Sequence, residues 1–390
     1  MKIYQSITML IVVATSMLLT SPVFSQFSKK EVSYKDSLDG AIDLSDYLIH
    51  AHGILPVPYI ITEPALGGFG GAIIPVYLQK RPAYIDSING QVKITPIAPD
   101  ITGGLALYTA NGTWATAAFR QGTLLKSRIK YIIGGAYANV FMSYYKTFPQ
   151  FGEKEFAFQI KTVPLFVQGI KRIGYSHWYG GLKYLFLKTD VYATGDSGLP
   201  ANFAKPREYS STVSQLGGVI ELDSRDNIFT PDNGIKFHVD AIRSDEFLGS
   251  DFEYWRVNYF SYLYKQLDEK VVGGLRIDGR QVFQDPPFFM YPYVELRGVP
   301  VNRYRGKASI LTEAEFRWDF FKRWSVLFYS GVGKAFDKWN EFNDAKLVYN
   351  YGTGFRYLIA RKFKLRMGLD FARGPEDFAY YIVFGSSWIK

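Results

Sequence analysis

Hydrophobic and polar residues alternate along most of this chain, from residue 66 to the C-terminus, in segments of about ten residues. Successive side chains of a strand point to opposite faces, so the pattern predicts strands that each have an apolar and a polar face. In segment 310–320 the apolar set is Ile310, Thr312, Ala314, Phe316, Trp318 and Phe320, opposed by Glu313, Glu315, Arg317 and Asp319. In the final segment we expect the apolar set to be Phe378, Tyr380, Ile382, Phe384 and Trp388.

The alternation predicts sixteen strands, and their expected ranges are 67–79, 101–109, 112–121, 127–137, 139–147, 154–171, 176–190, 209–222, 234–243, 252–264, 269–282, 309–320, 324–334, 346–358, 363–373 and 378–389. Connections after odd-numbered strands are often long: 80–100, 191–208, 283–308 and 335–345. Most connections after even-numbered strands are tight, as at Asn111-Gly112, Ala138-Asn139 and Phe321-Lys322-Arg323. Long loops on one rim and short turns on the other are typical of a transmembrane antiparallel β-barrel of the outer membrane. The alternative is a soluble all-β protein with uneven loops.

The N-terminal residues differ from the rest. Residues 1–25 contain Lys2, an apolar run from Met9 and a small-residue exit before Gln26, which predicts a cleaved secretory signal peptide; a single membrane anchor is the alternative. Residues 26–65 are too short for a folded periplasmic domain. They form either a disordered lead-in or a short helix, around 44–51, that packs on or inside the barrel. We therefore assign the barrel to residues 66–390.

Composition agrees with a membrane barrel. Aromatic residues make up 17% of the chain, yet the mean hydropathy is −0.06, because apolar and polar residues are interleaved. The absence of cysteine excludes disulfides and a lipid-modified cysteine. No apolar stretch after residue 25 reaches the roughly 18 residues of a spanning helix, so a membrane span must be β. The net charge of +9 is scattered, which favours lipid headgroups or a lumen over nucleic acid as its partner.

Two motifs go beyond strand statistics. The first is the turn 223–234, with the sequence Asp-Ser-Arg-Asp-Asn-Ile-Phe-Thr-Pro-Asp-Asn-Gly. Pro231 and Gly234 punctuate this turn, while Asp223, Arg225 and Asp226 are placed to pair locally and to cap backbone groups. The second motif is Glu-Leu-Arg-Gly-Val at 295–299. It lies in the longest predicted loop and precedes the strand that carries Glu313 and Glu315.

In this order and spacing, the two motifs resemble those of the outer-membrane assembly-factor barrels, the BamA, TamA and two-partner-secretion transporter superfamily, also called the bacterial surface antigen family. The resemblance covers residues 66–390, and the start at 56–67 is similar to small members that lack POTRA domains. It implies that the sixth outer loop folds into the lumen and that Arg297 docks on acidic strand residues.

By position, the resemblance makes Glu315 the partner of Arg297, and Gly298 lets the loop turn tightly. Two positions depart from the family pattern: Val299 replaces an aromatic residue, and 329–333 lacks an aspartate. The loop is therefore locked either by Glu315 and Glu313 alone or by Asp370 across the lumen.

Glycines gather where the predicted first and last strands meet. Gly67, Gly68, Gly70 and Gly71 start the first predicted strand, and Gly385 lies in the last. They predict either a weak seam, at which the family is thought to template incoming strands, or a barrel that simply closes there.

The expected role is assistance with insertion or transport of proteins or lipids at the outer membrane, with outer-membrane lipids, nascent outer-membrane proteins and assembly subunits as partners. The alternative is a structural or pore-like barrel. We expect no enzyme activity and no cofactor, because Glu313 and Glu315 beside Arg297 favour a salt network over acid-base catalysis. His50 and His52 lack a carboxylate at ligand spacing, so we expect no metal site.

Overall fold

The computed structural model describes residues 33–50, 54–79, 81–82, 84–88, 91–95, 100–148, 152–194 and 209–388. The predicted signal peptide, 1–25, lies outside these residues. None of the helices in the described ranges has the length and hydropathy needed to cross a bilayer.

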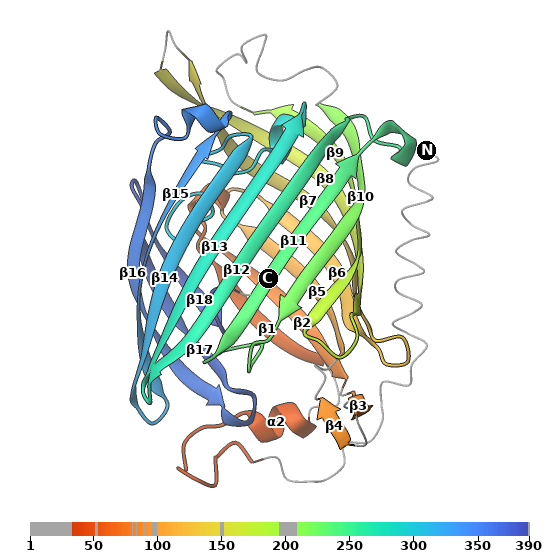
Figure 1. The fold of residues 1–390 in the computed structure, drawn as a ribbon. Helices are drawn as coiled ribbons and strands as arrows, with labels where there is room; N and C mark the ends of the chain where they lie inside the picture. Colours follow the sequence, from red (N-terminus) through yellow and green to blue (C-terminus); the bar gives the residue numbers. More distant parts are fainter. Residues whose placement is uncertain are drawn as a thin grey trace.

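The fold is a sixteen-stranded antiparallel sheet that curls into a nearly closed barrel (Figure 1), which confirms the predicted fold class and strand number. Each strand pairs with its neighbours in chain order. The strands are β1 (Ile54–Ile61), β2 (Gly70–Gln79), β5 (Asp100–Thr109), β6 (Trp114–Leu124), β7 (Ile129–Phe148), β8 (Gly152–Arg172), β9 (Trp178–Ala193), β10 (Ser210–Asp223), β11 (Gly234–Ser244), β12 (Tyr254–Asp268), β13 (Val271–Gln284), β14 (Ala308–Phe321), β15 (Trp324–Phe336), β16 (Val348–Ala360), β17 (Leu365–Arg373) and β18 (Phe378–Phe384).

Short elements lie between and before these strands. A separate hairpin, β3 (Tyr84–Ile88) and β4 (Gln91–Thr95), lies in the β2–β5 connection. The helix α2 (Ser45–His50) precedes β1. The connections also contain the 3-10 turns η1 (Pro64–Leu66), η3 (Glu246–Leu248), η4 (Phe288–Met290), η5 (Trp339–Glu341) and η6 (Arg361–Phe363).

The strand number is right through two errors that compensate. The prediction omitted β1, because Pro56 and Pro58 interrupt its sequence; proline is tolerated in an edge strand, and β1 ends the sheet. The barrel therefore starts at Ile54, ahead of the predicted boundary at residue 66. The prediction also divided β7 into two strands at Ala138-Asn139.

No turn exists at Ala138-Asn139. Both residues lie inside β7 and pair with β6 and with β8. Asn139 is buried, and its Oδ1 accepts a hydrogen bond from Gln159 Nε2 at 2.8 Å. Asparagine favours turns because its side chain mimics backbone groups, but here a neighbouring strand satisfies that side chain.

These errors change the assignment of the first connections to the two rims. The turn rim carries the connections after β2, β6, β8, β10, β12, β14 and β16, and the loop rim carries the others. The β2–β5 connection, predicted as an outer loop, therefore belongs to the turn rim, where its described β3–β4 hairpin lies on the same side as α2 (Figure 1). The Asn111-Gly112 turn instead lies on the loop rim, whereas Lys322-Arg323 lies on the turn rim as predicted.

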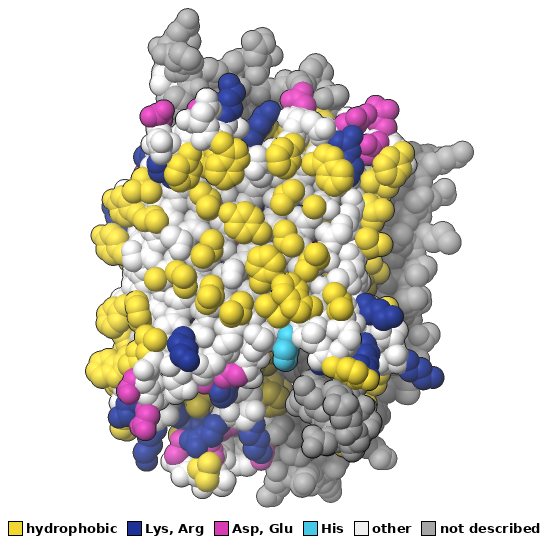
Figure 2. Space-filling model, viewed as in Figure 1, with side chains coloured by type: hydrophobic (Ala, Val, Ile, Leu, Met, Phe, Trp, Pro, Cys, Tyr) yellow, Lys and Arg dark blue, Asp and Glu magenta, His cyan; other side chains and the backbone are white. Residues whose placement is uncertain are grey.

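The two faces of the wall separate as the alternation predicts. In β14, Phe316 and Trp318 are each 51% exposed on the outer face, whereas Glu313 is fully buried on the inner face. Figure 2 shows hydrophobic side chains across the middle of the barrel and charged side chains gathered toward its two rims. An apolar band between charged rims is the surface that a bilayer requires.

The N-terminal strap, residues 33–50, packs on the turn rim next to the β14–β15 and β16–β17 turns. Leu44 N–H donates to Ile359 O at 2.7 Å, and Ser45 Oγ accepts from Lys362 N–H at 3.0 Å. A packed short helix was one of the two predicted alternatives for this region. The described residues 33–50 agree with this alternative, because they include the helix α2 and pack on the turn rim.

Arg323 holds the strap through three carboxylates. Its guanidinium lies 2.6 Å from Asp36 Oδ2, 2.7 Å from Asp39 Oδ2 and 2.9 Å from Asp43 Oδ2. The Arg323 side chain is only 2% exposed, so a buried cation depends on these partners. The strap immediately precedes β1 in the chain, and it therefore links the first strand to turns on the β14–β17 side of the barrel.

We expect Arg323→Ala to release the strap, because it leaves three clustered aspartates without their shared cation. Hydrogen exchange of residues 36–50 should accelerate by about tenfold or more, since a charged hydrogen bond contributes roughly 1.5–3 kcal/mol. Lys322→Ala is the matched control, because Lys322 is exposed in the same turn. Equal exchange in the two variants would contradict this role of Arg323.

Strap docking should also depend on acid pH. The hydrogen bond from Arg323 lowers the pKa of Asp39. Burial raises the pKa of Asp43, but the hydrogen bonds from Ser45, Arg361 and Arg323 outweigh burial and lower that pKa to about 2. Because these carboxyl groups have lower pKa values when the strap is docked, they stabilise docking at pH values above their undocked pKa of about 4. This stabilisation is lost as the pH falls toward the lowered pKa values. Pepsin should therefore cleave 33–50 faster at pH 2 than at pH 4, relative to a free peptide of the same sequence; an unchanged ratio would contradict this.

Candidate functional site

The loop-lock segment, residues 285–307, connects β13 to β14 on the loop rim and packs against the strand walls. Val294, Leu296 and Val299 are at most 4% exposed, and they pack with Leu311 of β14 and Val348 of β16. Val299 thus fills an apolar position where the family pattern has an aromatic residue. This packing places the Arg-Gly motif among inward-facing strand residues.

Arg297 contacts three carboxylates from two strands. Its Nε donates to Glu313 Oε1 at 3.1 Å and its Nη1 to Asp370 Oδ2 at 3.0 Å. Nη1 also lies 2.9 Å from Glu315 Oε2, so the predicted contact between Arg297 and Glu315 is present as an ion pair. The two alternatives for the lock are therefore combined, with Glu313, Glu315 and Asp370 sharing one guanidinium.

Gly298 is required where the loop-lock segment meets β17 and β18. Its φ is +78°, and a Cβ there would lie 2.9 Å from Gly374 N. Its N–H donates to Tyr381 Oη at 3.0 Å. The tight turn predicted at this glycine is confirmed, and a larger residue would collide with the backbone.

Four further residues complete the cluster, and sequence reasoning did not assign them to it. The Tyr329 ring lies under Arg297, with 3.4 Å from the guanidinium carbon to the ring centroid. Asn350 Nδ2 donates to Arg297 O at 3.0 Å and to Glu313 Oε1 at 2.8 Å. Arg356 Nη1 donates to Asp370 Oδ1 at 2.6 Å, and Arg276 Nη1 lies 3.8 Å from Glu313 Oε2. The sequence signal that could have found these four residues is their position on the inward-facing side of their strands.

The C-terminal tail, residues 385–388, joins the same cluster. Ser387 Oγ donates to Asp370 Oδ2 at 2.8 Å, and Trp388 Nε1 donates to Glu313 Oε2 at 2.6 Å. Trp388 is 3% exposed, so its predicted outward position is wrong, and β18 ends at Phe384 rather than 389. The physical reason is Gly385, whose φ of +78° ends the alternation and turns the tail inward.

The predicted motif in the β10–β11 turn pairs locally, as expected. Arg225 makes two parallel hydrogen bonds of 2.9 Å to the carboxylate of Asp223. Asp226 Oδ1 accepts from the N–H groups of Asp232 and Asn233 at 2.9 and 3.2 Å. Gly234 has φ +113°, and a Cβ would meet Ser224 O at 2.5 Å.

This turn also contacts the β16–β17 turn. Lys364 Nζ donates to Asp226 Oδ2 at 3.0 Å and to Asp232 Oδ2 at 2.6 Å. Asn227 Nδ2 donates to Phe363 O at 3.0 Å. The β16–β17 turn is therefore bound by the N-terminal strap and by the β10–β11 turn.

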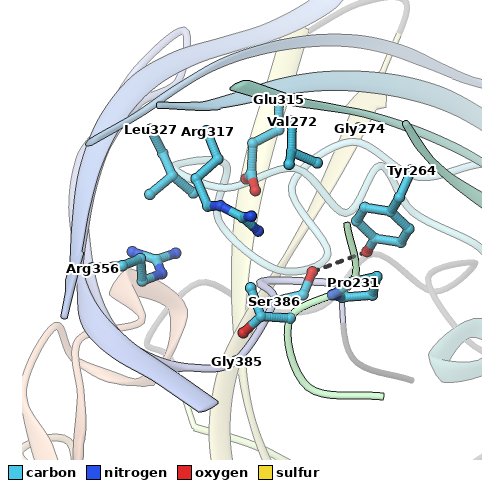
Figure 3. A pocket seen from close by; sticks show the side chains of 11 residues that line it. Pro231, Tyr264, Val272, Gly274, Glu315, Arg317, Leu327, Arg356, Gly385 and Ser386 are labelled. Atoms are coloured by element: carbon cyan, nitrogen blue, oxygen red, sulfur yellow. Dashed lines mark hydrogen bonds between the residues drawn. The ribbon is translucent and has the colours of Figure 1, made fainter. Parts of the chain in front are cut away.

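A small cavity with a mixed apolar and charged lining lies between the β10–β11 turn and the C-terminal tail (Figure 3). Pro231 and Ser386 lie on one side of it, and Glu315, Arg317 and Arg356 lie on the strand side. Tyr264 Oη and Ser386 Oγ are 3.0 Å apart. Within the described residues no group of histidine and carboxylate side chains is arranged to hold a metal.

Four of the five predicted seam glycines do not lie at the seam. Gly67 and Gly68, with φ of +87° and +73°, form the β1–β2 connection, whereas Gly70 and Gly71 pair with Ile61 and Ile60. The prediction is wrong because β1, and not β2, is the first strand. Only Gly385 is near the seam, directly after β18.

The true seam lies between β1 and β18, the two ends of the sheet. Among the described residues no backbone ladder joins these strands. Thr62 Oγ1 donates to Tyr380 O across the gap. The two edges are thus adjacent without forming a paired sheet.

The barrel resembles those of BamA and CdiB. Against BamA from Haemophilus ducreyi lacking POTRA domains 1–3, the TM-score is 0.56 at 13% identity, over 85% of this chain and 69% of that one. CdiB from Escherichia coli gives 0.56 at 8% identity and CdiB from Acinetobacter baumannii 0.54 at 9%, each over 85% of this chain. This chain covers 62% and 59% of those two proteins. The sequence matches no protein-family model and no curated protein.

We expect Arg297→Ala to destabilise the barrel strongly, because it leaves buried carboxylates without a shared cation. Breaking a buried ion pair from one side costs about 3–5 kcal/mol. Arg297→Lys should cost less, since it keeps the charge and loses only the fork of donors. The measurement is the folded fraction on unheated gels against urea.

Arg303→Ala is the matched control within the loop-lock segment, because Arg303 lies 3.8 Å from Glu376, away from the cluster. If Arg297→Ala were no less stable than Arg303→Ala, the cluster would not hold the segment in place.

Proposed function

We propose that this protein is a barrel of the Gram-negative outer membrane that assists insertion or transport of proteins, or lipids, at its β1–β18 seam. The observation that carries the proposal is the absence of a backbone ladder between these strands in the described residues. Unpaired strand edges are templates for another strand, and pairing at such an edge is β-augmentation. The fold similarity to BamA and CdiB supports the same role.

The proposal includes a sixth outer loop that lies in the lumen. The loop-lock segment is the sixth connection on the loop rim, and its support is the ion pairing of Arg297 with inward-facing Glu313 and Asp370. Trp388 adds a second segment at the same place. An interior filled in this way favours action at the wall over passage through the lumen.

The proposed partners are outer-membrane lipids, nascent outer-membrane proteins and assembly subunits, and the proposed role needs no enzyme activity. The alternative is a structural or passive pore-like barrel. The observation that favours a pore is the small cavity beside Arg317, because Glu315, Arg317 and Arg356 bring charged side chains to its lining.

Depletion of the protein in its own cells separates these two roles. If it assists insertion, the folded forms of other outer-membrane barrels should fall in the membrane fraction, measured by their mobility on unheated gels. Restored expression is the control. Unchanged barrel levels with altered uptake of small hydrophilic solutes would instead support the pore.

A disulfide across the seam tests the mechanism directly, since the native chain has no cysteine to interfere. Thr62→Cys with Tyr380→Cys joins positions whose side chain and carbonyl already touch. Under oxidising conditions this pair should abolish rescue of depleted cells, and a reductant should restore it.

The matched control joins β1 to its paired neighbour β2. Ile60→Cys with Gly71→Cys uses facing residues, and a Cβ at Gly71 meets open space. This second lock should leave rescue intact. Full rescue by the oxidised Thr62–Tyr380 lock would exclude a seam that opens.

A further inference from the structure

We infer that the two edges of the seam are chemically unequal, and that β18, not β1, is the edge on which an incoming strand pairs. The inference rests on the proposed function and names the part of the seam that performs it. The occupant is an extended strand of another chain with alternating apolar and polar residues. The two edges differ because β1 contains Pro56 and Pro58.

The register of β1 shows which way its prolines face. Pro56 pairs with Pro75 of β2, and neither residue has an N–H group. This pair therefore exchanges no hydrogen bonds, so the groups that bond β2 belong to residues 55, 57, 59 and 61. Residues 54, 56, 58 and 60 direct their backbone groups toward the seam.

Pro75 supports this assignment independently. By the same alternation, its backbone faces β5, where a missing N–H should interrupt the ladder. The β2–β5 pairing does break there: it runs to Ile73 opposite Ala106 and resumes at Val76 opposite Gly103. Pro75 thus removes a donor from the side that the alternation predicts.

The seam edge of β1 is therefore poor in donors. Two successive seam-facing positions, Pro56 and Pro58, present carbonyl groups alone. A strand pairing there would leave two of its own carbonyls without donors, which hydrocarbon does not tolerate. The side chains of Pro56, Pro58 and Ile60 are exposed on the outer face, so this edge borders lipid.

The seam edge of β18 is complete. Tyr380 O accepts from Thr62 Oγ1, so Tyr380 faces the seam, as do Phe378, Ile382 and Phe384 by alternation. None of these four is proline, so each offers both an N–H and a carbonyl. A strand can pair along the whole length of β18.

The contact between Thr62 and Tyr380 also sets the level of the prolines. In an antiparallel arrangement it places Ile60 beside Ile382 and Pro58 beside Phe384. The chain turns inward at Gly385, so β18 leaves the wall where the donors of β1 are missing. The prolines and the turn at Gly385 together leave the seam without backbone pairing at its turn-rim end.

The test uses the full-length protein in nanodiscs and a peptide probe. The probe copies residues 308–320, a strand with alternating faces, with a cysteine in place of Ala314. The protein carries either Ile60→Cys on β1 or Ile382→Cys on β18, two positions at the same level. Disulfide adducts are quantified by mass spectrometry after mild oxidation.

We expect Ile382→Cys to capture at least about ten times more probe than Ile60→Cys, since a few net hydrogen bonds suffice for a tenfold difference. Adding Pro56→Val and Pro58→Val should bring the ratio close to one, because both edges then carry donors. Pro75→Val is the matched control and should leave the ratio unchanged.

The variants also allow a measurement without the probe. If Pro56→Val with Pro58→Val permits a β1–β18 ladder, hydrogen exchange of residues 378–384 should slow by about tenfold or more. Folding of each variant is checked by mobility on unheated gels.

Equal or greater capture at Ile60→Cys in the native background would overturn the inference and leave strand pairing at the seam intact. A ratio that the valines do not change would overturn the role of the prolines. Absence of adducts at both positions in every background would overturn the proposed function as well.

Discussion

A strand that crosses a bilayer needs hydrogen-bond partners on both edges, because the hydrocarbon core holds no water to take their place. Fourteen of the sixteen strands meet this constraint, since each lies between two paired neighbours. β1 and β18 do not: in the described residues no ladder joins them, and Thr62, which follows β1, donates a side-chain hydrogen bond to Tyr380 O. The prolines of β1 and the left-handed turn at Gly385 both lie at these unpaired edges.

Burial of charge is the second constraint, and it organises the interior. Arg297 would be costly to bury alone, and it is matched by Glu313, Glu315 and Asp370, which are in turn shared with Arg276 and Arg356. The same carboxylates bind the tail after β18. One network therefore connects the loop-lock segment, the four strands β13, β14, β16 and β17, and the tail after β18.

The turn rim uses the same chemistry for a different purpose. Arg323 gathers three aspartates of the N-terminal strap, while Lys364 gathers two from the β10–β11 turn. The β16–β17 turn lies between these two sets of ion pairs. Together these ion pairs attach the segment before β1 to the turns that connect β14 to β17. This attachment exists although β1 and β18 share no ladder in the described residues.

The sequence by itself determined the barrel, because the requirement for one lipid-facing and one inward-facing side imposes an alternation that needs no tertiary information. It also located the Asp223–Gly234 turn, which depends on local spacing. The pairing of Arg297 with acidic residues of β14 was an expectation of the family resemblance, and it agrees with the cost of an unpaired buried charge. The tertiary structure decided what local propensity hides. β1 tolerates Pro56 and Pro58 because it is an edge strand. Asn139 stays in a strand because Gln159 donates to its side chain. Trp388 lies inside the barrel because the chain turns at Gly385 and Glu313 accepts its N–H. In each case a partner distant in sequence reverses the local preference.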